Sequence, residues 1–254
     1  MFVHFVGAGP GDPELLTIKG KRLLEQAEVI IYTGSLINPD LLRYTRRDAE
    51  VYNSASMTLE EISNLIVSSV QQGKQVVRLH TGDPSLYGAI QEQIDFLQDH
   101  QIKCQVVPGV SSFSAAAALL QKEYTKPGVS QTLIITRMGG NTPVPQKEKL
   151  EVLAKHQASM CIFLSVHMMK DIVSELVTGG YPLNTPVAVV YKASWPEELI
   201  IRGTLENILC RVEAQKIEKT ALILVGSFLD EERTRSCLYH PGFTHLFREG
   251  TETE

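Results

Sequence analysis

The sequence predicts an α/β fold: two α/β domains with an active-site cleft between them, the first sheet mostly parallel and the second mixed. Short apolar runs alternate with amphipathic segments in the first half, an order that builds a parallel sheet covered on both faces. The pattern changes from about Lys126, and a hairpin-like return after Trp195 and Pro196 indicates a mixed second sheet. The 254 residues, 43% of them hydrophobic, allow one large domain or two modest ones.

In the first half, five apolar runs are expected to form strands, at residues 2–6, 29–32, 51–52, 75–79 and 103–107. Helices should fill the gaps between them. The expected helix starts are Asp12 before Pro13, Thr58 with Glu61 as a capping box, and Asp83 before Pro84, with a helix end at Gly73. Ligands of such sheets bind at the carboxyl ends of the strands, so the loops that follow the strands are the expected site.

In the second half, strands are expected at residues 132–136, 160–164, 187–191, 199–202 and 220–225. Helices are expected at 147–155, 168–177 and 205–214. This pattern predicts one domain over residues 1–125, a second over 126–230, and a polar tail over 231–254 that is loosely attached or packs on a partner.

The charge and composition argue against several classes of protein. A formal net charge of −5 disfavours a nucleic-acid binder, which usually carries a basic stripe. No apolar run approaches the roughly 20 residues that span a bilayer, and no signal peptide is evident, so we expect a cytoplasmic protein without membrane contact. The four cysteines form no CxxC pair and the seven histidines form no HExxH pair, so no metal site is expected.

A glycine-rich loop, GAGPGDP, follows the first predicted strand where a dinucleotide fingerprint would lie. Asp12 occupies the position of the third glycine, and a carboxylate there would repel a pyrophosphate from the helix start. The loop therefore indicates either a ligand without phosphate or a tight turn without any ligand.

The stretch HTGDPSLYG follows the fourth predicted strand and is expected to begin a helix at the same rim of the sheet. Gly82 allows close backbone approach, Asp83 accepts hydrogen bonds, Pro84 fixes the helix entry and Tyr87 offers a flat face. S-adenosylmethionine has an ammonium, a sulfonium, a ribose and an adenine but no phosphate, so it suits these groups. A common turn remains the alternative.

Three motifs together resemble the tetrapyrrole (class III) methyltransferase family: GAGPGDPELLT at 7–17, TGDPSLYGAI at 81–90 and PGVSSFSAAAA at 108–118. Within that family, YTGSL at 32–36 and SASMTLEEI at 54–62 resemble the branch that methylates C11 of precorrin-4 or cobalt-precorrin-4 in cobalamin biosynthesis. The resemblance runs from about Met1 to Asp230. It implies a two-domain methyltransferase that uses S-adenosylmethionine, releases S-adenosyl-L-homocysteine and forms a homodimer.

The resemblance also implies which residues contact the methyl donor. Those of the first domain are Pro10, Gly82, Asp83, Pro84, Tyr87, Ser111 and Ser112. Those of the second domain, on the adenosine side, are Leu164, Ala193, Thr220 and Ala221.

The tetrapyrrole is expected to lie over a different set of residues. Relatives that methylate uroporphyrinogen carry an acidic residue where this chain has Thr33, so a proton-handling role there does not transfer. The candidates for the substrate trough are Thr33, Gly34, Ser35, Ser54, Ser56, Met57 and Arg137. Arg78, Arg137 or Lys192 could pair with substrate carboxylates. No catalytic residue is assigned.

Three alternatives stay open at this point. The first is another acceptor of the same family, such as uroporphyrinogen III, another precorrin, a diphthine intermediate or ribosomal RNA. The second is a non-catalytic sensor of an adenosyl ligand, and the third is a nicotinamide oxidoreductase. The sequence also leaves open whether the acceptor contains cobalt.

Overall fold

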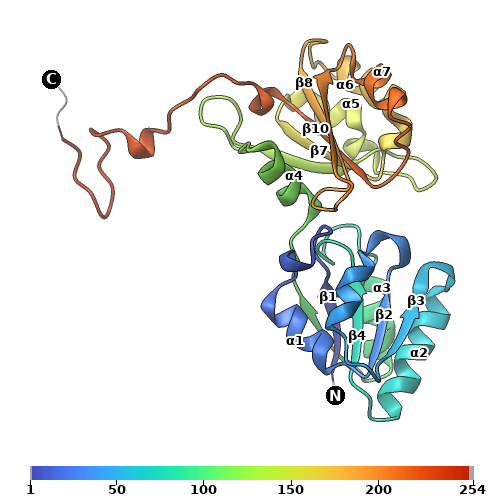
Figure 1. Ribbon diagram of the computed structural model, residues 1–254. Coiled ribbons are helices and arrows are strands. Elements are labelled where there is room, and N and C mark those ends of the chain that lie inside the picture. The colour runs from blue at the N-terminus through green and yellow to red at the C-terminus, as the bar shows by residue number, and fades with distance from the viewer. Residues whose placement is uncertain (1, 252–254) are drawn as a thin grey trace. The chain divides into compact units, whose positions relative to one another are not determined.

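A computed structural model describes residues 2–251 and contains two compact units (Figure 1). The first consists of Met1–Leu119 together with Lys192–Leu199, and the second of Leu120–Tyr191 together with Ile200–Glu254. The first unit is therefore discontinuous in sequence, because a short segment from the second half packs with it. The units are described separately below.

The first unit is built on a five-stranded sheet in the order β3-β2-β4-β1-β5. The strands are β1 (Phe2–Gly7), β2 (Val29–Tyr32), β3 (Glu50–Asn53), β4 (Val76–His80) and β5 (Lys103–Val107). Every pairing is parallel, which confirms the predicted parallel sheet. Because the strands are parallel, all five carboxyl ends meet at one rim.

Apolar residues cover both faces of this sheet, as strand alternation requires. On one face Val6, Ile30 and Leu79 pack with Leu24 of α1 (Ile18–Gln26). On the other face the strands pack against α2 (Leu59–Gln71) and α3 (Gln91–Asp99), with Ile66 and Leu97 fully buried. α4 (Ser112–Leu120) follows β5.

The predicted helix boundaries in this unit are partly confirmed. The Thr58 capping box is present, and α2 ends just before Gly73, whose φ is +81°. Asp12 caps only the 3-10 turn η1 (Pro13–Leu15), and α1 begins after Thr17. The helix predicted at Pro84 is wrong: residues 81–90 form a turn, and α3 begins at Gln91.

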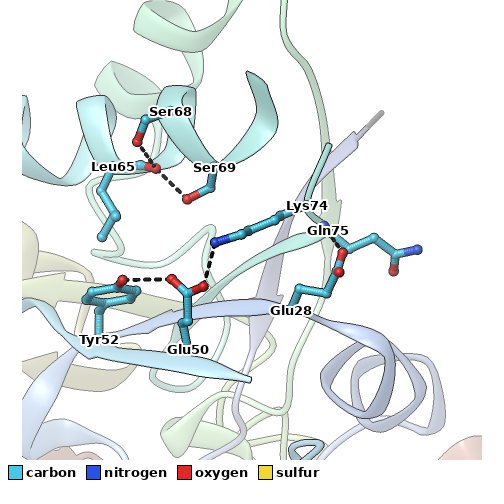
Figure 2. A network of polar contacts seen from close by, with 8 residues as sticks. All are labelled: Glu28, Glu50, Tyr52, Leu65, Ser68, Ser69, Lys74 and Gln75. Atoms are coloured by element: carbon cyan, nitrogen blue, oxygen red, sulfur yellow. Dashed lines mark hydrogen bonds and ion pairs between the residues drawn. The ribbon is translucent and has the colours of Figure 1, made fainter. Parts of the chain in front are cut away.

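A polar network ties the amino ends of three neighbouring strands, at the edge opposite the rim (Figure 2). Glu50 at the start of β3 accepts hydrogen bonds from Lys74 and from the Tyr52 hydroxyl. Glu28, just before β2, accepts from the Gln75 backbone N–H at 2.9 Å. The hydrogen bonds from Lys74 and Tyr52 lower the pKa of Glu50, so Glu50 and Lys74 form an ion pair at neutral pH. This edge therefore has a structural role.

The second unit is built on a five-stranded sheet in the order β6-β7-β10-β8-β9. The strands are β6 (Leu133–Arg137), β7 (Ser159–Phe163), β8 (Pro186–Tyr191), β9 (Leu199–Thr204) and β10 (Ala221–Val225). β6 is parallel to β7, whereas β10 is antiparallel to both β7 and β8, so the predicted mixed sheet is confirmed.

Helices of the second unit pack on this sheet around Met160, Ile162, Ile172 and Ile223, which are fully buried. α6 (Met169–Thr178) matches the predicted helix, whereas α7 (Ile208–Ala214) is shorter than predicted. The helix predicted over 147–155 is broken into 3-10 turns around α5 (Leu150–Leu153).

The segment after Asp230 is mostly exposed through residue 251, and residues 252–254 of the predicted tail lie outside the described residues. Arg248 organises part of it by donating to the carbonyls of Leu238, His240 and Phe243. Within residues 2–251, no helix is both long and apolar enough to cross a bilayer.

Candidate functional site

The candidate residues of the first unit lie at the carboxyl rim of its sheet, as predicted. Residues 8–12 follow β1, residues 81–90 follow β4, and residues 108–111 follow β5. β1 lies between β4 and β5 in the sheet, so these three loops are neighbours.

Glycines bring the three loops into backbone contact. Gly9 and Gly82 form an antiparallel bridge, in which the Gly82 N–H donates to the Gly9 carbonyl at 2.9 Å. A Cβ built on Gly109 would lie 2.1 Å from the Gly82 oxygen and 2.8 Å from the Gly7 Cα. Gly82 itself has φ +59°, a conformation that favours glycine. No side chain larger than hydrogen fits this junction at Gly109.

The Asp83 carboxylate fastens two of these loops. One oxygen accepts from the Gly109 backbone N–H at 2.9 Å. The other accepts from the backbone N–H of Ser85 at 2.8 Å and from the Ser85 hydroxyl. Partial burial raises the pKa of Asp83, but the hydrogen bonds from Ser85 and Gly109 outweigh it, so the pKa lies below its ordinary value. Asp83 is therefore a carboxylate at neutral pH that joins the loop after β4 to the loop after β5.

The loop after β1 has few N–H groups left for an anion. Ala8 N–H donates to His80 O at 2.7 Å and Gly9 N–H to Gly82 O at 3.3 Å. Asp12 N–H donates to Ser194 Oγ at 3.0 Å, and Glu14 N–H donates to the Asp12 carboxylate at 2.8 Å. A pyrophosphate needs such N–H groups. Their engagement within the protein argues against a dinucleotide at this loop.

The donor candidates of the first unit differ in exposure. Pro10, Pro84 and Ser111 are buried, and Ser112 opens α4 and is half-buried. Tyr87 is 43% exposed and has φ +56°, a left-handed conformation that a non-glycine residue rarely adopts. An exposed aromatic side chain on a strained turn at a sheet rim is typical of a ligand-binding position.

Five of the seven candidates for the substrate trough lie in, or directly after, two short 3-10 turns at the same rim. Gly34 and Ser35 belong to η2 (Gly34–Leu36), and Ser54 and Ser56 belong to η4 (Ser54–Ser56), with Met57 directly after it. A Cβ on Gly34 would lie 2.6 Å from the Ala55 Cβ, so the two turns are in contact.

Two further contacts fix these turns. Ser54 Oγ donates to the Tyr32 carbonyl at 3.0 Å, and Thr81 Oγ1 donates to the Leu36 carbonyl at 2.9 Å. The second bond connects the substrate candidates to the loop after β4. Thr33 Oγ1 is buried and has no hydrogen-bond partner among the described residues.

Two buried basic side chains lie beneath this rim. Arg78 is 3% exposed and donates to Gln93 Oε1 at 3.1 Å and to the Ile31 carbonyl at 3.2 Å. Burial lowers its pKa to about 10, so it stays a cation. The prediction that Arg78 pairs with substrate carboxylates is wrong, because strand alternation directs its side chain into the layer beneath α3.

His80 is also 3% exposed, and its ring stacks on Phe5 with 5.9 Å between the centroids. Burial, and secondarily the Arg78 charge, lowers the pKa of His80 to about 3, so the imidazole is neutral at pH 7. Its Nε2 atom has no hydrogen-bond partner among residues 2–251.

In the second unit, strand register brings the other candidates to one edge of the mixed sheet. Arg137 at the end of β6 pairs with Phe163 at the end of β7, and Ala221 at the start of β10 pairs with Tyr191 at the end of β8. Because β10 runs antiparallel to β7, its first residues lie beside the last residues of that strand.

Leu164 and Thr220 lie at this edge but outside the strands in which they were predicted. Leu164 follows β7, is 59% exposed and has φ +56°; Thr220 precedes β10 and has φ +57°. Strained non-glycine backbone of this kind is concentrated at functional sites. An exposed leucine held in that conformation offers an apolar surface suited to an adenine.

Arg137, the basic candidate at the same edge, already has protein partners. Its guanidinium donates to the carbonyls of Thr142 at 3.0 Å and Pro143 at 2.9 Å. Arg137 therefore holds the loop after β6, and pairing with a substrate carboxylate stays a prediction.

Ala193 lies in the segment Lys192–Leu199, which belongs to the first unit. Ala193 is 6% exposed, so its small side chain is packed against neighbours. The next two residues contact the loop after β1: Trp195 Nε1 donates to the Pro10 carbonyl at 2.9 Å, and Ser194 Oγ accepts from Asp12 N–H. Sequence reasoning missed Ser194, Trp195 and Asn38, which also binds this loop. The sole tryptophan of the chain, placed before a proline, was the available signal.

Among residues 2–251, no group of three or more His, Cys, Asp or Glu side chains is placed to hold a metal ion.

The fold and rim define an α/β protein with glycine-lined loops suited to a ligand without phosphate. The match to the tetrapyrrole (corrin/porphyrin) methylases covers residues 3–209, and the chain belongs to that family of methyltransferases.

Individual relatives agree with this assignment. The cobalt-precorrin-4 C(11)-methyltransferase of Methanocaldococcus jannaschii is 58% identical over 247 residues, which cover 97% of this chain and 95% of that one. The solved structure of a cobalamin biosynthetic enzyme, cobalt precorrin-4 methyltransferase, has a TM-score of 0.88 and 45% identity, and covers 90% of this chain and 96% of that one.

A third protein was solved with a ligand. Uroporphyrin-III C-methyltransferase from Thermus thermophilus, complexed with S-adenosylhomocysteine, has a TM-score of 0.74 and 29% identity, and covers 90% of this chain and 93% of that one. The predicted family membership is confirmed.

Proposed function

We propose that this chain transfers a methyl group from S-adenosylmethionine to C11 of precorrin-4 or cobalt-precorrin-4 in cobalamin biosynthesis. The observation that carries the proposal is 58% identity, over nearly the full length of both chains, to a cobalt-precorrin-4 C(11)-methyltransferase. The cobalt form is the first acceptor to test, because the names of that relative and of the solved structure at TM-score 0.88 both include cobalt.

The residues of the first unit fit a methyl donor that has no phosphate. Several N–H groups of the loop after β1 already have acceptors within the protein, and Gly82 joins this loop to the next through its backbone. Exposed Tyr87 of the first unit and exposed Leu164 of the second unit each offer an apolar face. The residues proposed to hold the donor are Pro10, Gly82, Asp83, Pro84, Tyr87, Ser111, Ser112, Leu164, Ala193, Thr220 and Ala221. Binding between the two units stays a prediction.

The donor, when bound, supplies a methyl group on a sulfonium whose leaving group needs no further activation. The chain then has to hold the methyl donor and the acceptor carbon in the right relative position. Asp83, Gly82 and Gly109 fix the relative arrangement of two rim loops, which lowers the entropy lost when reactants are brought into line. Accurate placement of this kind can lower the activation free energy by several kcal/mol.

The acceptor is proposed to lie over the turns η2 and η4, with Thr33, Gly34, Ser54, Ser56 and Met57 as its neighbours. These turns contact each other and are joined to the donor loop by one bond, from Thr81 to the Leu36 carbonyl. Changes in η2 or η4 should therefore alter the choice of acceptor or ring carbon, whereas changes at Asp83 should alter donor binding.

Methyl transfer can be followed with labelled S-adenosylmethionine. The purified chain is incubated with cobalt-precorrin-4, and in parallel with metal-free precorrin-4 and with uroporphyrinogen III. Label at C11 of either precorrin-4 form, located by NMR or mass spectrometry, is the expected result. Tight binding of S-adenosylhomocysteine without label in any acceptor would instead favour a sensor.

Calorimetry separates the remaining alternatives. S-adenosylhomocysteine should bind and NAD should not; binding of NAD alone would refute the proposal. A homodimer in the cytoplasm also stays a prediction, and light scattering measures the assembly.

A further inference from the structure

The segment Lys192–Leu199 lies far from the first rim loop in sequence and yet packs with it in the first unit. Trp195 Nε1 donates to the Pro10 carbonyl at 2.9 Å, across 185 positions of sequence. Ser194 Oγ accepts from the Asp12 N–H at 3.0 Å. Two successive residues of the segment thus bind two backbone groups of the loop.

Gly11 lies between those two backbone groups and contacts the indole itself. A Cβ built on Gly11 would lie 2.0 Å from Trp195 Cδ1, so the ring lies directly on the glycine. The buried Asn38 donates from Nδ2 to the Gly11 carbonyl at 3.0 Å. Three consecutive residues of the loop are therefore fixed by side chains from two distant segments.

Without these contacts the loop would have many conformations. It contains glycines at positions 9 and 11, and glycine loses more conformational freedom on ordering than any other residue. Because Pro10 and Gly11 have their carbonyls already paired, the loop gains its shape before any ligand arrives. Order established in advance lowers the entropic cost of binding.

The segment is itself held in a fixed shape. Lys192 Nζ lies 5.0 Å from the Trp195 ring centroid and 3.3 Å from Glu197 Oε1. The Ser194 N–H donates to Glu198 Oε2 at 3.2 Å. Lys192 and Ser194 both have left-handed backbone, with φ +46° and +67°. Such strain persists where surrounding contacts impose it, which is common at functional sites.

We propose that Trp195 and Ser194 are positioning residues that hold residues 10–12 in the conformation that binds the methyl donor. The inference rests on the proposed function, because it takes the loop after β1 as part of the donor site. It assigns a role to two residues that touch the loop rather than the reacting atoms. Their removal should weaken donor binding while leaving the chemical step intact.

The test compares two variants with a matched control. Trp195→Phe keeps an aromatic ring but removes the indole N–H, and Ser194→Ala removes the hydroxyl acceptor. Tyr181→Phe is the control, since its buried hydroxyl donates to the Ala158 carbonyl within the second unit. Each change removes one side-chain to backbone hydrogen bond, but only the first two affect the loop.

Calorimetry with S-adenosylhomocysteine should give a Kd about 3-fold to 10-fold higher for each of the first two variants, the range that one neutral hydrogen bond produces. The KM for S-adenosylmethionine should rise by a similar factor, with kcat and the KM for the tetrapyrrole within 2-fold of wild type. Tyr181→Phe should lower Tm and leave the Kd unchanged.

Two outcomes would overturn the inference, and they are distinguishable. If the wild-type chain binds S-adenosylhomocysteine and both loop variants bind it within 2-fold of wild type, the positioning role is refuted and the proposed function stands. If the wild-type chain does not bind S-adenosylhomocysteine, the proposed function fails as well. Ser194→Ala keeps the packed indole, so it supplies the answer if Trp195→Phe does not fold.

Discussion

Asp83→Asn tests whether one carboxylate fixes the donor loops. The carboxylate accepts from Gly109 N–H with one oxygen, and from the N–H and hydroxyl of Ser85 with the other. Asparagine has nearly the same shape but only one acceptor oxygen. It can satisfy Ser85 or Gly109 but not both, and its amide group would place a donor against the remaining donor.

The expected loss of free energy is that of one hydrogen bond to the carboxylate. A hydrogen bond to a charged acceptor contributes about 1.5–3 kcal/mol, and we take the lower part of that range, about 1.5–2 kcal/mol, because Asp83 is only partly buried. For a chain of this size the loss corresponds to a Tm lower by about 3–8 °C. If it is expressed fully in donor binding, the Kd for S-adenosylhomocysteine rises by about 10-fold to 30-fold.

Calorimetry measures the Kd for S-adenosylhomocysteine and thermal unfolding measures the Tm, with Asp95→Asn as the matched control. Asp95 lies exposed on α3, where its carboxylate accepts from the Gln91 side chain, so its variant should match wild type in both assays. The hydrogen bonds lower the pKa of Asp83, so its contribution is complete above the unfolded pKa of about 3.9 and is lost as pH falls through the folded pKa. The stabilities of Asp83→Asn and wild type should therefore converge in acid.

The reasoning would be refuted by a variant that binds S-adenosylhomocysteine within 2-fold of wild type although its Tm is several degrees lower. That result would mean that the bond from Gly109 stabilises the fold without shaping the donor site. Methylation at another ring carbon would contradict the separation between the donor loops and the substrate turns.

Three further changes test other parts of the structure. Gly109→Ala forces a Cβ within 2.1 Å of the Gly82 oxygen and should cost about 3 kcal/mol of unfolding free energy; a Tm within 2 °C of wild type would contradict this. Thr58→Ala removes the capping box with Glu61 and should cost about 1 kcal/mol in urea titrations, while calorimetry shows unchanged donor binding because Thr58 follows β3, whereas the donor loops follow β1, β4 and β5. His80→Phe tests the buried imidazole, whose pKa of about 3 means that the unfolded chain alone binds a proton between pH 6.5 and 3. Wild type should lose about 1.4 kcal/mol per pH unit more than this variant as pH falls across that window in urea titrations, and equal slopes would show that His80 titrates normally.

The parallel sheet and its rim could be predicted because they depend on local patterns. Apolar runs separated by amphipathic segments specify strands and helices, and parallel strands place the loops at one rim regardless of packing details. The Thr58 capping box and the helix end before Gly73 are likewise set by neighbouring residues. Identity of the ligand class came from the combined loop motifs rather than from any single loop.

The features that escaped prediction depend on distant contacts. Asp83 before Pro84 is a common helix start, and one carboxylate oxygen does accept from the Ser85 N–H. The other binds Gly109, 26 residues away, and the chain continues as a turn through Tyr87 and Ala89, which both have positive φ. Arg78 has the charge of a ligand-binding residue, but its position on a central strand directs it inward. Trp195 is conspicuous as the sole tryptophan of the chain, but its partner Pro10 lies 185 positions away and could not be read from neighbouring residues.

The discontinuity of the first unit has a consequence for biosynthesis. A ribosome completes Met1–Leu119 well before it adds Lys192–Leu199, a delay of about 4–16 s at the usual elongation rates. During that interval the nascent sheet can form while the indole that covers Gly11 does not yet exist. The donor loop of a newly made chain is therefore completed late, and a fragment that stops at residue 119 would carry that loop permanently unfinished.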